Sequence, residues 1–196
     1  MGPIIGLANG LGAVNAALLA VGRWLGATAM GLMVIVILLQ VFCRYVLGSA
    51  LAWPEEASRF FMLWSTGLMA PTAFRRSGFV AIDMVVRLLH SRIVLCLASL
   101  LMALTIIILW VGLQLSWSEV TGIGGRFETD SLWLPVSLNG TDWFKTPKSW
   151  MMASLLVGLT LLLLVAVELF LRSLAALAGA EDRLMEIPET ITLGAE

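Results

Sequence analysis

Long apolar runs, separated by short polar segments, set the pattern of this chain. Three runs, residues 25–47, 93–117 and 149–171, are long enough to cross a bilayer as helices, since a span needs about 20 mostly apolar residues. A fourth run, 60–74, reaches spanning length if its helix begins at Pro54, because proline is well tolerated in the first helical turn. The pattern therefore predicts four transmembrane helices, over about 25–47, 54–74, 93–117 and 149–171.

The resulting fold class is an all-α integral membrane protein, with one four-helix membrane domain over residues 1–196. Residues 1–22 are rich in Gly and Ala and contain Asn9 and Asn15. They favour a short interfacial helix that leads into the first span, although an extension of that span is the open alternative.

A polar face is predicted ahead of the third span. Asp83, Arg87 and His90 recur at helical spacing, so they share one side of a helix. A helix from Asp83 to Trp117 would be about 50 Å long, longer than a hydrocarbon core of about 30 Å. Its first turns are therefore expected to leave the bilayer or to tilt along it.

The longest polar segment, about 118–148, joins the third and fourth spans. Gly, Pro and Asn punctuate it, so we expect a loop with some order of its own. It contains the aromatic residues Trp133, Trp143 and Phe144. Because tryptophan favours membrane interfaces, these side chains are expected to rest on lipid headgroups or to contact a partner protein.

The distribution of basic residues predicts the orientation. Four spans place both termini on one side, and seven of the 12 Lys and Arg residues, among them Arg75 and Arg76, would lie on that side. Because basic residues are more frequent in cytoplasmic segments, this count predicts cytoplasmic termini. The tail of about 173–196 would then be cytoplasmic and the 118–148 loop extracytoplasmic.

Composition strengthens the membrane assignment and removes several kinds of chemistry. Hydrophobic residues make up 60% of the chain and charged residues 13%, against about 25% charged residues in soluble domains; the mean hydropathy is +0.97. A net charge of -1 gives no reason to expect nucleic acid. His90 is the sole histidine, and Cys43 and Cys96 lie in apolar runs. We therefore predict no catalytic residue, no metal site and no cofactor.

Charged residues gather where the first span ends and the second begins. Arg44 closes the first run, and Glu55, Glu56 and Arg59 follow Trp53. The glutamates precede Arg59 by four and three residues, spacings at which side chains meet on a helix. We expect a structural ion cluster that supports this helix start, with a local ion pair and a bridge to Arg44. A contact between subunits and an ion or substrate pathway are the alternatives.

Few polar residues lie inside the other spans. Gln40, Thr105 and Gln114 are isolated, and Glu168 lies near the end of the fourth run. A self-sufficient transporter usually has polar groups or broken helices near the middle of the membrane. The chain is therefore not expected to transport a solute by itself.

The segment 40–83 carries a recognisable pattern. It contains Gln-Val followed by Arg-Tyr, then Trp-x-Glu-Glu and an Arg, a Trp in the second run, and an Arg-containing turn before an Asp. The residues are Gln40, Val41, Arg44, Tyr45, Trp53, Glu55, Glu56, Arg59, Trp64, Arg75, Arg76 and Asp83. This pattern resembles the small membrane subunit of tripartite ATP-independent periplasmic (TRAP) transporters, the DctQ-like family, and the layout of four spans agrees with it.

The resemblance implies a subunit that is not an enzyme and needs no cofactor. In such systems a large permease subunit carries the substrate and sodium sites, a periplasmic binding protein delivers the substrate, and the small subunit braces the large one. We therefore expect a scaffold subunit of a sodium-coupled, binding-protein-dependent secondary transporter for organic acids or similar anions, in the bacterial inner membrane. The binding protein would be met indirectly or through the 118–148 loop, at Trp133, Trp143 and Phe144.

Two other functions fit the residues. One is a self-contained oligomeric four-helix channel or exporter, and the other is a membrane anchor for a peripheral enzyme.

Small residues along the first span, Gly26, Ala27, Ala29 and Gly31, are compatible with close packing against a partner helix.

Overall fold

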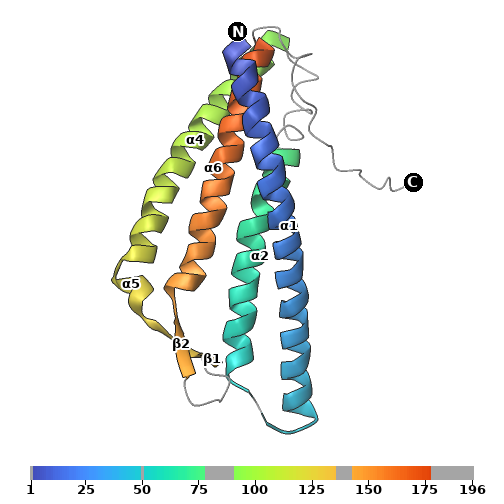
Figure 1. Cartoon of the computed structure of the whole chain (residues 1–196), viewed down its shortest axis with the longest axis vertical. Helices are drawn as coiled ribbons and strands as arrows, with labels where there is room; N and C mark the ends of the chain where they lie inside the picture. Colours follow the sequence, from blue (N-terminus) through green and yellow to red (C-terminus); the bar gives the residue numbers. More distant parts are fainter. Residues whose placement is uncertain (1, 50, 78–90, 136–142, 178–196) are drawn as a thin grey trace, which may run out of the picture.

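Four long helices form a bundle in the computed structural model, which describes residues 2–49, 51–77, 91–135 and 143–177. The long helices are α1 (Gly2–Tyr45), α2 (Trp53–Ser77), α4 (Ser91–Thr121) and α6 (Ser149–Leu177), shown in Figure 1. Between α4 and α6 lie the short helix α5 (Ile123–Arg126) and the strands β1 (Glu128–Pro135) and β2 (Trp143–Pro147).

Neighbouring helices alternate in direction. Figure 1 shows α1 and α4 running toward the strands, and α2 and α6 running away from them. Helix α2 packs between α1 and α6, α4 packs against α6, and α1 also contacts α6. We call the end with β1, β2 and the first turn of α2 the hairpin end, and the end with the start of α1 and the last turns of α6 the terminal end.

Three of the described helices are long and apolar enough to cross a membrane: Gly6–Tyr45 of α1, Leu95–Thr121 of α4, and α6. They contain the first, third and fourth predicted spans. Helix α2 has 25 residues, a sufficient length, but its first turn carries two glutamates and its last turn two arginines. The polar ends of α2 lower its overall apolarity, so a fourth crossing stays a prediction.

Helix α1 starts much earlier than the predicted first span. It is continuous over 44 residues, about 66 Å at the usual helical rise. Of the two possibilities for residues 1–22, the structure has the extension, because the first half of α1 occupies the chain from Gly2 onward; the position of this half relative to the membrane stays a prediction. Gly and Ala do not break the helix here, because packing against α6 and α2 supplies the stability that glycine lacks in isolation.

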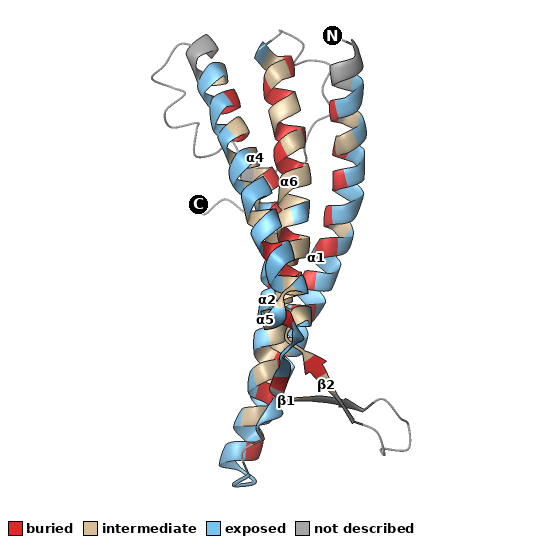
Figure 2. Ribbon diagram, turned by 90° about the vertical axis from the view of Figure 1, so that its left-hand side faces the viewer, coloured by how far each residue is buried: buried red, intermediate tan, exposed pale blue. Residues whose placement is uncertain are grey.

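The apolar core lies between α1, α4 and α6. It consists of Leu19, Met102, Val165 and Leu169, with Phe74 and Phe170 packed against it. Figure 2 shows that buried positions follow the inner faces of the helices, while the outer face of α1 is exposed along much of its length. This distribution is typical of a bundle whose outer surface meets lipid or another membrane protein.

Helices α2 and α6 approach each other most closely at two glycines. A Cβ on Gly67 would lie 2.5 Å from the carbonyl oxygen of Ser154, and a Cβ on Gly158 would lie 3.0 Å from the Cα atom of Gly67. Small residues of this kind allow backbones to touch, as in many membrane helix pairs. Trp64 adds a hydrogen bond of 3.1 Å from its Nε1 to the carbonyl of Trp150.

The 118–148 loop is ordered where the structure describes it, as expected. Helix α4 continues to Thr121, α5 follows, and β1 pairs with β2 in an antiparallel hairpin. The described residues are mostly helical, in agreement with the all-α expectation, and a small two-stranded sheet lies at one end of the bundle. The predicted polar face of Asp83, Arg87 and His90 lies outside the described residues.

Candidate functional site: two polar clusters at opposite ends of the bundle

The first polar cluster lies at the hairpin end, in the first turns of α2. Pro54 is buried there, and Glu55 forms an ion pair with Arg59 one turn later. This pair is the local interaction that the four-residue spacing predicted. Both side chains are about two-thirds exposed, at 64% and 67%, so we expect the pair to contribute only about 0.3–0.5 kcal/mol.

Glu56 has a different environment from Glu55. Its Oε2 atom accepts hydrogen bonds from the backbone amide of Ser131, at 2.6 Å, and from the Ser131 hydroxyl, at 2.8 Å. The same hydroxyl lies 3.1 Å from the carbonyl oxygen of Ala52. Glu56 therefore joins the start of α2 to strand β1, 75 positions later in the chain.

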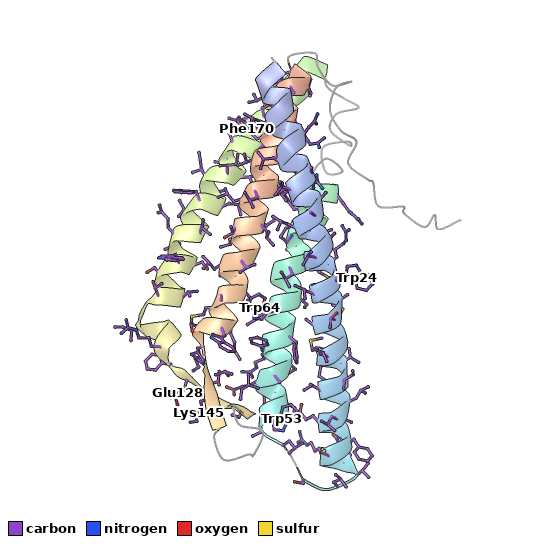
Figure 3. The ribbon with its side chains drawn as sticks, viewed as in Figure 1. Trp24, Trp53, Trp64, Glu128, Lys145 and Phe170 are labelled. Atoms are coloured by element: carbon purple, nitrogen blue, oxygen red, sulfur yellow. The ribbon has the colours of Figure 1, made fainter. Side chains whose placement is uncertain are left out.

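Arg44 and Trp53 are near this cluster in the sequence but have other surroundings. Arg44 is exposed in the last turn of α1, and it takes part in none of the ion pairs found among the described residues. The expected bridge from Arg44 to the glutamates is therefore not formed. Trp53 is 36% exposed and lies at the first turn of α2, close to the hairpin in Figure 3.

Two buried threonines pair where β1 begins and β2 ends. The hydroxyl of Thr129 donates a 2.8 Å hydrogen bond to the carbonyl of Thr146, and both side chains are buried. Lys145 and Glu128 lie on opposite strands (Figure 3) with 3.8 Å between Nζ and Oε2. The backbone of Lys148 donates to the Phe127 carbonyl at 2.8 Å. The first two contacts join the strands to each other, and the third joins the residue before β1 to the residue before α6.

The residues predicted to contact a binding protein all belong to this hairpin. Trp133 lies opposite Lys145, Phe144 opposite Leu134, and Trp143 opposite Pro135. The backbone pairing thus brings the three aromatic positions onto two adjacent strands. What their side chains contact lies outside the described part, so their role stays a prediction.

The second polar cluster is buried at the terminal end, and we call it the Glu168 network: Asn15, Arg75, Glu168 and Arg172. Glu168 is fully buried. Arg75 donates to both of its carboxylate oxygens, at 3.0 and 2.7 Å, and Arg172 donates to Oε1 at 3.0 Å. Asn15 donates to Oε2 at 2.8 Å. One carboxylate therefore ties together α1, α2 and α6.

The backbone of α1 completes the Glu168 network. Arg75 donates to the carbonyl of Gly12 at 2.9 Å. A Cβ on Gly12 would lie 3.0 Å both from Nη2 of Arg172 and from Oε1 of Glu168. Glycine therefore lets α1 pass over the charged groups at short range. Ser99 of α4 extends the polar layer through a 3.2 Å contact with Ser173.

The Glu168 network was not predicted from the sequence. Glu168 was noted only as a residue near the end of the fourth run, and Arg75 was used for the orientation and for the family pattern. A partial signal was available, because Glu168 and Arg172 are four residues apart on one helix. The contacts with Arg75 and Asn15, at separations of 93 and 153 positions, have no local sequence signal.

The carboxylate of the Glu168 network has its donors within the same chain, and in the described part of the molecule no group of three or more His, Cys, Asp or Glu residues could hold a metal ion. A groove of about 410 Å³ between α4 and α6 is lined mainly by apolar side chains, including Leu113, Trp117 and Leu156.

Comparison with protein families supports the same kind of function. Residues 33–176 match the model of the DctQ component of tripartite ATP-independent periplasmic transporters. The comparisons with curated proteins and with solved structures gave no match. The matched family is one of transporter components and not of enzymes. Because the match covers most of the chain and includes all of α2, α4 and β1, this protein belongs to the DctQ component family of TRAP transporters.

Proposed function

We propose that this chain is the small scaffold subunit of a sodium-coupled secondary transporter that receives organic acids or similar anions from a periplasmic binding protein. In this proposal α1, α2, α4 and α6 each cross the inner membrane, and both termini are cytoplasmic. The chain braces a large permease subunit, which carries the substrate and sodium sites. Family membership supports this assignment.

The exposed face of α1 is the observation that carries the proposal. Large apolar side chains are exposed along it from Leu7 to Tyr45, a length of about 57 Å at the helical rise. A hydrocarbon core is about 30 Å thick. Even a tilt of about 40°, at the upper end for membrane helices, would leave this face spanning about 44 Å. Lipid tails alone do not cover such a length, whereas a second membrane protein would.

The exposed residues of α1 recur every seven positions, in a pattern suited to helix packing. One row starts at Leu18 and the other at Leu7, and all members are exposed. The rows are Leu18, Leu25, Leu32 and Leu39, and Leu7, Val14, Val21, Ile35 and Phe42; in the second row the polar Thr28 stands between Val21 and Ile35. A seven-residue apolar repeat at two positions three or four apart is typical of helices that pack in a left-handed supercoil. We call these two rows the α1 seam, and we assign them to contact with a helix of the large permease.

The hairpin end supports the proposed contact with the periplasmic binding protein. On the assigned orientation it faces the periplasm, and Trp133, Trp143 and Phe144 lie on its two strands. Tryptophan and phenylalanine are frequent in protein interfaces. We therefore place the contact with the binding protein on this hairpin.

Copurification tests the proposal directly. The tagged chain, produced in its native host and extracted in mild detergent, is expected to recover a large polytopic permease. Proteoliposomes with both proteins should then take up substrate only when the binding protein and a sodium gradient are present. Recovery of this chain alone, together with ion flux in its own liposomes, would contradict the scaffold function and favour a self-contained channel.

A further inference from the structure

Adjacent glutamates at the start of α2 have separate tasks. Among the described residues Glu55 pairs with Arg59 of the same helix, whereas Glu56 bonds to Ser131 on β1. We infer that Glu56 is a positioning residue, which sets the orientation of the hairpin relative to α2 and thereby the placement of the surface that meets the binding protein. The part that concerns docking rests on the proposed function.

The irregular pairing of β1 explains why Ser131 needs an acceptor outside the sheet. The strands are in register at Glu128 with Pro147 and again at Trp133 with Lys145, so β1 advances five residues while β2 advances two. Residues inside such a bulge are left out of the regular ladder. The amide of Ser131, which lies within it, donates instead to the carboxylate of Glu56.

The geometry of the Ser131 contact is restrictive. Two donors of one residue, the amide and the hydroxyl, converge on the same oxygen atom of Glu56. Hydrogen bonds to a charged acceptor are shorter and about twice as strong as neutral ones. The hairpin also continues into α5 on one side and toward α6 on the other, and the Ser131 hydroxyl lies against the Ala52 carbonyl. The contact with Glu56 adds a charged acceptor from α2 itself, so its loss should leave the position of β1 relative to α2 less restrained.

The contact also lies next to the predicted docking residues. Trp133 follows Ser131 by two positions on the same strand. A change in the position of Ser131 therefore moves the part of β1 that contains Trp133. Among the described residues Glu55 has no equivalent bond to the hairpin, because its bond with Arg59 stays within α2.

Hydrogen exchange of the Ser131 amide tests the inference without reference to transport. The full-length chain is measured in lipid nanodiscs as the wild type and as Glu56→Ala, Glu56→Gln and Glu55→Ala. In Glu56→Ala we expect peptides that contain Ser131 to exchange about 10- to 100-fold faster, the effect of losing a hydrogen bond to a charged group. Glu56→Gln keeps an acceptor oxygen, so its exchange rate should lie between those of the wild type and Glu56→Ala. Glu55→Ala, the matched control, should exchange like the wild type.

A second readout tests the docking role. In proteoliposomes with the complete transporter, Glu56→Ala should raise the concentration of binding protein needed for half-maximal uptake and leave the maximal rate near that of the wild type. Unchanged exchange at Ser131 in Glu56→Ala would overturn the inference. Faster exchange with an unchanged half-saturating concentration would overturn the docking role alone, and would also count against the hairpin as the docking surface in the proposed function.

Discussion

The side-chain amide of Asn15 donates a 2.8 Å hydrogen bond to the carboxylate of Glu168, at the opposite end of the sequence. The same amide nitrogen lies 3.2 Å from the carbonyl of Leu164. Both contacts require α1 to lie directly against α6 at the terminal end. The first half of α1 is therefore an integral part of the bundle, although its Gly- and Ala-rich sequence is only moderately apolar.

Removal of the Glu168 carboxylate should strongly destabilise the bundle. In Glu168→Leu, Arg75 and Arg172 would stay buried without their counter-charge. An uncompensated buried charge of this kind typically costs about 3–5 kcal/mol. We expect a melting temperature roughly 10 °C lower in detergent, measured by size-exclusion chromatography of heated samples. Glu55→Leu, which breaks only the exposed pair with Arg59, should melt close to the wild type.

Simultaneous removal of all three charges tests whether that loss of stability comes from the arginines left without a counter-charge or from the loss of the network itself. In Arg75→Met, Glu168→Leu, Arg172→Met no buried charge remains, so stability should recover at least part of what Glu168→Leu loses. A triple variant less stable than Glu168→Leu would mean that the Glu168 network contributes net stability beyond cancelling its own charges.

A methyl group at Gly12 should disturb the Glu168 network from the side of α1. Its Cβ would lie 3.0 Å from atoms of Arg172 and Glu168, which must shift by a few tenths of an ångström. We expect Gly12→Ala to lose about 1 kcal/mol, since crowding offsets the better helix propensity of alanine. Gly10→Ala is the control, because its Cβ would meet no described atom within 4 Å. Equal melting temperatures for the two variants would contradict close passage of α1 over the network.

The contact between α2 and α6 should tolerate no side chain at Gly67. A Cβ there would lie 2.5 Å from the backbone oxygen of Ser154, and a backbone cannot move aside as a flexible side chain does. We expect Gly67→Ala to separate the helices and to destabilise the chain by about 1–3 kcal/mol. Gly31→Ala, on a part of α1 where a Cβ meets no described atom within 4 Å, should be neutral or stabilising by up to about 1 kcal/mol. Equal melting temperatures for Gly67→Ala and Gly31→Ala would contradict the close contact between α2 and α6.

Local sequence signals predicted the helices well, and long-range contacts poorly. Apolar runs predicted where α4 and α6 lie, and Pro54 predicted the start of α2, because these features depend on neighbours within one helix. Spacing also predicted the pair of Glu55 and Arg59, which is confirmed. The length of α1 was underestimated, since Gly and Ala give little signal of their own and the helix is supported by packing against α2 and α6.

The different roles of Glu55 and Glu56, in the polar cluster at the hairpin end, could not be predicted from the sequence. Glu55 and Glu56 are adjacent and suit the same helix dipole, so spacing alone treats them alike. They differ because Ser131, 75 positions later, lies beside only one of them. In the same way, the bridge from Arg44 was expected from proximity in the chain, but the short connection to α2 does not bring its side chain to the glutamates.

The α1 seam should crosslink to the large permease with its seven-residue period. A photoreactive amino acid at Ile35 or Phe42, both well exposed, is expected to yield a product with the mass of this chain plus the permease, because the proposed partner helix packs along these positions. Leu104 on α4 is exposed to a similar extent and serves as a matched position outside the seam, where the yield should be several-fold lower. Products that contain two copies of this chain would instead identify the seam as a homodimer contact. Equal yields at Leu104 would show that the seam has no special role in assembly.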